Sequence, residues 1–196
     1  MPFAVAPVTL HGRVVRLEPL RPAHLDGLAA VGLDPALWEW TYDRITTRDE
    51  FARRIEEALA EEARGTLLPF VTVLAADGSL AGETRFLNIA PEHDRVEIGS
   101  TWVAPAWQRS AVNTEAKLLM LRHAFETWGC RRVELKTDAL NARSRAAILR
   151  LGAVEEGTLR RQVRTATGRV RDTVYFSILD DEWPRVRERL EARLTR

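Results

Sequence analysis

The stretch with the clearest capacity for chemistry is a short loop that leads into a strong helix. The loop runs from Gln108 to Asn113 and is polar at both ends and small in the middle. The first N–H groups of a helix have no partner within the helix and lie at the positive end of its dipole, so they suit an anion such as phosphate. An ordinary strand-to-helix turn, with Ser110, Asn113 or Thr114 as its N-cap, explains the same residues. The local pattern therefore predicts either an anion site or a plain helix start.

The elements on either side of this loop determine how it is presented. Residues 95–103 alternate as a strand before the loop, and residues 132–138 alternate as another strand after Gly129 breaks the helix. The helix between them has an apolar face. That face carries Leu118, Leu121, Phe125 and Trp128, and the polar positions include Lys117, Arg122 and Glu126. A long helix between two strands predicts a β-α-β unit with parallel strands and a right-handed crossover.

The remaining segments complete the pattern of an α/β domain with a mixed sheet. Thr47 and Glu50 form a capping box at the start of a helix, and Asn141 caps another helix, which Gly152 closes. Further strands are expected at 13–20, 67–75, 80–89, 154–164 and 169–179, and further helices at 23–32 and after Asp180 or Asp181.

Length and composition limit the classes of function. The 196 residues fit a single domain, 1–196, with a loose lead-in at 1–10 and a C-terminal helix at 181–196. A formal net charge of +1 gives no reason to expect nucleic acid or an anionic membrane as partner. The single cysteine, Cys130, excludes a disulfide framework within the chain, and the four histidines lack metal-ligand spacing. No signal pattern or bilayer-spanning apolar run is visible, so a cytoplasmic location is expected.

The order of these elements, together with two longer pieces of sequence, resembles the GNAT N-acetyltransferases. The pieces are W-Q-R-S-A-V-N-T-E-A-K-L-L-M-L and N-A-R-S-R-A-A-I-L-R-L-G-A-V-E-E-G, and both are similar to the RimJ/RimL-like branch of that family. That branch includes enzymes that acetylate the N-terminal amine of ribosomal proteins. The resemblance implies an α/β (α+β) fold with a mixed, mostly antiparallel central sheet, a splayed parallel pair and helices on both faces.

The resemblance also implies acetyl-CoA as the co-substrate, without a metal. The pyrophosphate would be held by the loop residues Gln108, Arg109, Ser110, Ala111, Val112 and Asn113. The pantetheine amides would pair with Trp102, which can also be a core aromatic, and Val103, so the two parallel strands must splay apart after Val103. Asn141 would hydrogen-bond the pantetheine arm, although its N-cap role explains it equally well. Ser144 lies one helical turn later and can face the same side.

One departure from the family pattern lies in the loop itself. Ala111 and Asn113 stand where the family has glycine and a second small residue. Glycine lets the backbone approach a ligand closely, whereas alanine adds a methyl group that is comfortable at negative φ, as at a helix start. We therefore expect CoA binding to survive.

The implied reaction needs a proton acceptor for the amine and a donor for the departing thiolate. Many GNAT enzymes have a tyrosine as donor where this chain has Ile148, and in the RimL-like branch a serine at the place of Ser144 is the candidate. A serine near a helix start can also simply satisfy local backbone. Glu97 is the candidate base because its strand leads into the loop. Alternation places Glu97 on the face opposite Val96 and Ile98, which also suits a solvated strand residue. Glu83, on the neighbouring strand, and water are the alternative bases.

The acceptor side of the site is less well defined. Trp38, Trp40 and Tyr42 lie in a segment without a clear period, where they either line a substrate pocket or fill a gap between two helices. Glu83 is a further candidate substrate contact. We expect direct acetyl transfer to a primary amine, with the N-terminus of a protein such as a ribosomal protein as the leading acceptor. The alternatives are a small-molecule amine, or a CoA-binding sensor or interaction module without turnover. Both a monomer and a homodimer fit the sequence.

Overall fold

Alternating apolar residues build one eight-stranded sheet in the computed structural model, which describes residues 3–195. The strands are β1 (Leu10–His11), β2 (Val15–Pro19), β3 (Leu68–Leu74), β4 (Leu80–Ala90), β5 (Arg95–Val103), β6 (Arg132–Asp138), β7 (Val154–Arg164) and β8 (Val170–Leu179). Their order across the sheet is β1-β2-β3-β4-β5-β6-β8-β7. Only β5 and β6 pair in parallel, and the other neighbours are antiparallel. The mixed, mostly antiparallel sheet is therefore confirmed.

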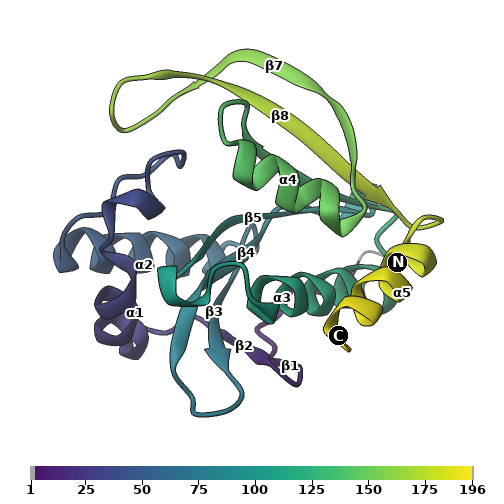
Figure 1. Cartoon of the computed structure of the whole chain (residues 1–196), viewed down its shortest axis with the longest axis horizontal. Coiled ribbons are helices and arrows are strands. Elements are labelled where there is room, and N and C mark those ends of the chain that lie inside the picture. Colours follow the sequence, from purple (N-terminus) through teal and green to yellow (C-terminus); the bar gives the residue numbers. More distant parts are fainter. Residues whose placement is uncertain (1–2, 196) are drawn as a thin grey trace.

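Helices with well-defined ends cover this sheet (Figure 1). They are α1 (Leu25–Gly32), α2 (Arg48–Ala63), α3 (Ala111–Arg122), α4 (Ala142–Leu151) and α5 (Trp183–Leu194). At the start of α2, the Thr47 hydroxyl accepts the Glu50 N–H at 3.2 Å, and the Glu50 carboxylate accepts the Thr47 N–H at 3.1 Å. The predicted capping box is thus present. Gly152 ends α4 at φ +111°, a conformation that favours glycine.

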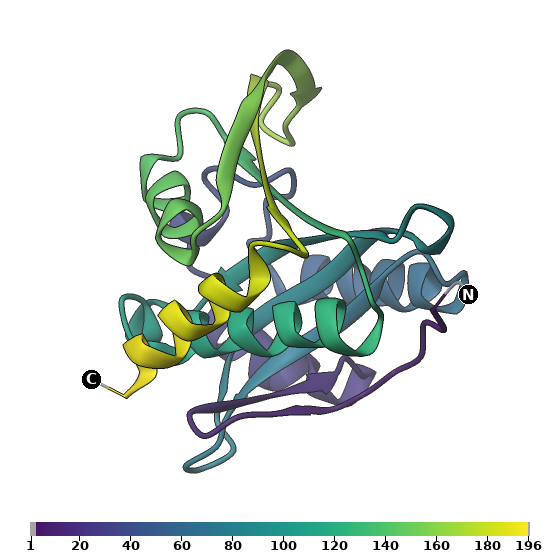
Figure 2. The ribbon, with the colours of Figure 1, turned by 90° about the vertical axis from the view of Figure 1, so that its right-hand side faces the viewer.

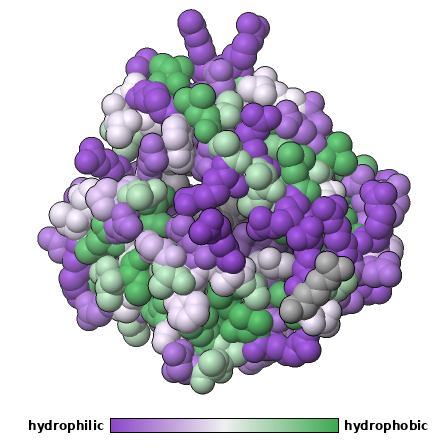
Figure 3. All heavy atoms as spheres, viewed as in Figure 1, coloured by the Kyte–Doolittle hydropathy of each residue, from purple (hydrophilic) through white to green (hydrophobic). Residues whose placement is uncertain are grey.

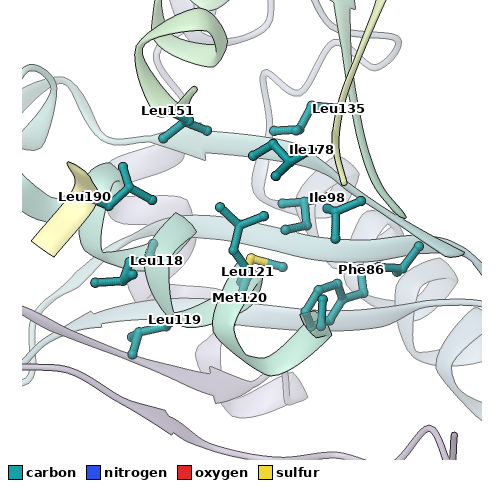
Figure 4. Close-up of a cluster of buried hydrophobic side chains, with 14 of the residues drawn as sticks. Phe86, Ile98, Leu118, Leu119, Met120, Leu121, Leu135, Leu151, Ile178 and Leu190 are labelled. Carbon is teal, nitrogen blue, oxygen red and sulfur yellow. The ribbon is translucent and has the colours of Figure 1, made fainter. Parts of the chain in front are cut away.

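The two faces of the sheet carry separate hydrophobic clusters. Adjacent residues of β3 divide between them: Phe70 packs in the cluster that includes α3, α4 and α5, and Val71 packs in the cluster that includes α1 and α2. In the first cluster, Leu118 to Leu121 of α3 meet Leu151 of α4, Leu190 of α5 and side chains of the central strands (Figure 4). The prediction of helices on both faces is confirmed.

Helix α3 is buried on almost every side. Helix α5 lies along it, and the sheet covers it on another side (Figure 2). As a result, Lys117 is only 5% exposed, although helical spacing placed it among the polar positions. That prediction is wrong because Lys117 faces β4 and β5, where its Nζ contacts the hydroxyl groups of Thr84 and Thr101.

The N-terminal segment also differs from expectation. The ring of Phe3 stacks on that of Trp128 with 4.7 Å between centroids, and Val5 and Val8 pack against the main cluster. The segment expected as a loose lead-in is therefore held against the domain from residue 3 onward.

The parallel ladder between β5 and β6 is short. It joins Arg95 with Arg132, Val96 with Val133, and Glu97 with Glu134, and then it ends. Beyond it, β5 follows β4 and β6 follows β8, so the two halves of the sheet diverge. The predicted splay is present, but it begins at Glu97 and not after Val103. Among the described residues, no helix is both long and apolar enough to cross a membrane.

Candidate active site

The loop between β5 and α3 ends at a capped helix start. The hydroxyl of Ser110 accepts the N–H of Val112 at 3.3 Å, so Ser110 is the N-cap among the three candidates. Ala111 is the first helical residue and has no positive φ, so its methyl group causes no backbone strain. Arg109, by contrast, has φ +60° and turns the chain before the cap. The remaining N–H groups of the first turn are free of helical partners, as an anion site requires.

Gln108 connects this loop to two other elements. Its Nε2 donates to the carbonyl oxygen of Val103 at 2.9 Å, at the end of β5. Its Oε1 accepts from Arg143 in the first turn of α4 at 2.8 Å. One polar atom of the Asn113 amide is buried without a partner in residues 3–195. The loop is thus fixed relative to both the strand end and α4.

The start of α4 has the expected cap. The Oδ1 of Asn141 accepts the backbone N–H of Ser144 at 2.9 Å, which confirms the N-cap role of Asn141. Ser144 is half-buried. Ile148, which occupies the place of the missing tyrosine, is buried in the main cluster and offers no proton.

Glu97 is a buried carboxylate, with 1% of its surface exposed, so the alternative of a solvated strand residue is wrong. Its Oε2 accepts from Asn88 at 2.7 Å and lies 2.9 Å from Nζ of Lys136. Burial opposes the charge of Lys136, but the carboxylate of Glu97 raises the pKa of that amine above its ordinary value. Glu97 and Lys136 thus form an ion pair across β5 and β6, where their ladder ends.

Glu83 belongs to a different network. It is fully buried, and its carboxylate accepts from Arg85 at 3.0 Å, from Trp102 at 3.0 Å and from Arg54 at 3.4 Å. Burial alone would raise its pKa, but the two guanidinium groups and the indole N–H hold the pKa of Glu83 below its ordinary value. A catalytic base at neutral pH needs the opposite shift, so these contacts favour a structural role for Glu83.

The aromatic segment divides between core and surface. Trp38 is buried against Phe51 and Trp102, which agrees with the gap-filling alternative. Trp40 and Tyr42 are half-buried beneath arginines of the β7–β8 hairpin: Arg169 lies 5.3 Å from the Trp40 ring centre, and Arg171 lies 4.4 Å from that of Tyr42. These two rings border the hairpin, whereas Trp38 does not.

Sequence reasoning missed Lys136, which lies beside Glu97, and Tyr175, which lies beside Lys136. Lys136 lies opposite Tyr175 in the β6–β8 ladder, and its Nζ is 5.8 Å from the centre of the Tyr175 ring. The alternation of residues 132–138 did place Lys136 on the face opposite Val133 and Leu135. What the sequence lacked was the register of β8, which comes from a distant part of the chain.

The described residues fit a CoA-type ligand on two observations. After Glu97 the edge of β5 has no β6 partner, so its backbone groups are available to pair with the amides of an extended ligand. Helix α3 presents its N-terminus at the end of the same strand. The face shown in Figure 3 is hollowed near its centre, and hydrophilic side chains surround the hollow.

No group of three or more potential metal ligands is found among residues 3–195. Burial raises the pKa of the Cys130 thiol to about 12, which makes it a poor nucleophile.

Comparison with known proteins agrees with this architecture. The family model described as an acetyltransferase (GNAT) domain matches residues 15–154, so the chain belongs to the GNAT acetyltransferase family. A GCN5-related N-acetyltransferase from Brucella melitensis is 33% identical, with a TM-score of 0.89, over 96% of this chain and 86% of that one. RimJ from Mycobacterium smegmatis, solved in complex with CoA-disulfide, is 27% identical, with a TM-score of 0.80, over 98% of this chain and 95% of that one.

A further relative comes from Bacillus subtilis (strain 168). The protein named "Putative ribosomal N-acetyltransferase YdaF" is 34% identical over 110 residues, or 56% of this chain. The match spans 59% of the length of that protein. The resemblance to the GNAT family and its RimJ/RimL-like branch is confirmed.

Proposed function

We propose that this chain transfers the acetyl group of acetyl-CoA directly to a primary amine. The observation that carries the proposal is the end of the parallel ladder at Glu97 and Glu134, beside the N-terminus of α3. In this proposal the first turn of α3, after Ser110, holds the pyrophosphate. The pantetheine arm follows the free edge of β5 toward Glu97, and its amides pair near Trp102 and Val103.

The leading acceptor is the N-terminal amine of a protein such as a ribosomal protein. One relative supports this assignment by its name, "Putative ribosomal N-acetyltransferase YdaF". Trp40 and Tyr42, beneath the β7–β8 hairpin, are the proposed acceptor contacts. A small-molecule amine is the second candidate within the same chemistry. A cytoplasmic location agrees with a ribosomal acceptor.

The amine must lose a proton before it attacks the thioester. We assign this proton to Glu97, a buried carboxylate in the last residue pair of the β5–β6 ladder. Its present partners are the amide of Asn88 and the ammonium group of Lys136, so an incoming substrate ammonium competes for the same oxygen atom. Ser144 is the proposed hydrogen-bond donor to the departing sulfur, because it lies in the first turn of α4, next to Arg143 and its bond to Gln108.

The release of free thiol from acetyl-CoA tests the proposal. The protein is incubated with acetyl-CoA and with peptides that carry the N-terminal sequences of ribosomal proteins. The same peptides with a blocked N-terminus serve as matched controls, and small amines form a second panel. Thiol release with the free peptides alone is the expected result. CoA binding without turnover on any amine would favour a sensor, and failure to bind CoA would overturn both assignments.

A further inference from the structure

Lys117 is a buried cation that the proposed chemistry does not use. It lies in the middle of α3, and 5% of its surface is exposed. No carboxylate of residues 3–195 forms an ion pair with it, and Glu115, the nearest acid on α3, accepts the N–H groups of residues 13–15. Burial is the only cause that lowers the pKa of Lys117, to about 7. A buried charge without a counter-ion is costly, and an apolar residue of similar size would usually serve stability better.

The partners of this amine are two hydroxyl groups. Its Nζ lies 3.0 Å from Oγ1 of Thr84 and 2.6 Å from Oγ1 of Thr101, and the two hydroxyls are 2.8 Å apart. Thr84 is 1% exposed, whereas Thr101 is half-buried. The ammonium group donates N–H bonds to both hydroxyl groups and polarises them. Because the hydroxyl groups are neutral, these contacts do not neutralise the charge of Lys117. Thr101 is the member of this cluster that reaches the surface.

A β-bulge aims Thr101 at the lysine. The β4–β5 register shifts where Ser100 adopts φ +47°, and the extra residue reverses the alternation of β5. Without the shift, alternation from Ile98 would place Thr101 on the face of Glu97. With the shift, Trp102 takes that face and Thr101 turns toward α3. Thr101 also lies on the part of β5 that has no β6 partner.

We propose that Lys117, acting through the hydroxyl of Thr101, is the counter-charge for the thiolate of CoA. The inference rests on the proposed function, which brings the sulfur to the splay between β5 and β6. When the acetyl–sulfur bond breaks, its electron pair goes to sulfur, and the Thr101 O–H donates a hydrogen bond to that anion. The proton that the amine loses before attack goes to Glu97, on the opposite face, and the second nitrogen proton goes to water as the amide forms. The thiolate takes a proton from solvent when CoA leaves. Lys117 is a positioning residue, and Thr101 contacts the sulfur as a second donor in addition to Ser144.

The ionisation of bound CoA tests this proposal without turnover. The thiolate is followed by its ultraviolet absorbance against pH on the full-length protein saturated with CoA, with desulfo-CoA as the blank. We expect bound CoA to be about tenfold more ionised at a given pH in the wild type than in Lys117→Met, a difference of one pKa unit. Thr101→Val should behave like Lys117→Met, and Thr101→Ser should retain the wild-type value.

Thr84→Val is the matched control. It also removes one hydroxyl partner of Lys117, but it leaves Thr101 in place, so the thiol should titrate as in the wild type. Equal titration of bound CoA in the wild type, Lys117→Met and Thr101→Val would overturn the inference. An equal shift in Thr84→Val and Thr101→Val would also overturn it, because the effect would then follow from disturbed packing. If the wild type does not bind CoA, the proposed function itself fails, which is a distinct outcome.

Discussion

The Nζ of Lys136 lies 2.9 Å from Oε2 of Glu97 and links β5 to β6 at the point where their ladder ends. The pair thus takes over the connection between the strands where backbone pairing stops. Both residues lie on the face of the sheet opposite α3, and Tyr175 of β8 lies across from Lys136 in the β6–β8 ladder. Any acceptor that reaches the splay from this face meets a carboxylate and an ammonium side by side.

Glu97→Gln should reduce turnover about 100-fold, the usual contribution of a general base. The substitution also leaves the ammonium of Lys136 without its counter-ion, which should cost about 3 kcal/mol of the free energy of unfolding. Steady-state kinetics and urea unfolding measure the two effects separately.

A double variant separates these two roles. Glu97→Gln combined with Lys136→Met removes both charges, so stability should recover while turnover stays low. If turnover recovers together with stability, Glu97 acts through the fold alone and is not the base.

Glu83→Gln should change how stability depends on pH. Because folding lowers the pKa of Glu83, its contribution to stability is present above the ordinary value near 4.5 and is lost as pH falls through the lower pKa of the folded state. Urea unfolding should therefore show a smaller loss of stability on acidification in the variant than in the wild type. An identical acid dependence in both proteins would contradict the ionised state assigned to Glu83.

Ser144→Ala should lower turnover by about tenfold, because it removes a hydroxyl donor from the departing sulfur. The N-cap of α4 uses the backbone N–H of Ser144 and not its side chain, so stability should be preserved. CoA affinity should also change little, as calorimetry would show. An unaltered rate would remove Ser144 from the chemistry.

Ala111→Gly should leave CoA affinity unchanged or increase it, since Ala111 already sits at a helix start without positive φ. The greater backbone freedom of glycine should cost about 0.5–1 kcal/mol of stability. Calorimetry with CoA, together with thermal unfolding, checks both statements. Weaker CoA binding at equal folding would mean that the methyl group itself contacts the ligand.

Tyr42→Ala should raise the KM of the acceptor about threefold, because it removes the ring that lies under Arg171 and holds the hairpin. The KM of acetyl-CoA should stay constant, since its proposed contacts are the start of α3 and the free edge of β5, and not Tyr42. Tyr42→Phe keeps the ring and should retain the wild-type KM. Equal changes in both KM values would mean that Tyr42 does not act on the acceptor side specifically.

Local signals predicted the parts of the fold that depend on neighbouring residues. The capping box of Thr47 and Glu50, the Asn141 cap and the strand from Arg95 to Val103 all have the expected positions. These features follow from backbone hydrogen bonding and side-chain alternation within a few residues of each other. For the same reason, the loop proposed to bind an anion could be located from contiguous residues alone.

Features set by distant segments escaped this kind of prediction. Lys117 is buried because α3 packs it against β4 and β5, and the splay begins at Glu97 because β4 and β8 draw the two parallel strands apart. Likewise, the bulge at Ser100 turns Thr101 toward α3, against the simple alternation of its strand.

The sequence by itself determined the family, the order of the elements and the loop proposed to hold the cofactor, since each of these lies in contiguous residues. Only the tertiary structure decided the electrostatics of the site. It gave Glu97 a lysine partner, enclosed Glu83 between two arginines and placed Lys117 against the hydroxyl groups of Thr84 and Thr101. The physical reason is that the state of a buried charge depends on which distant groups exclude water from it and which ones face it.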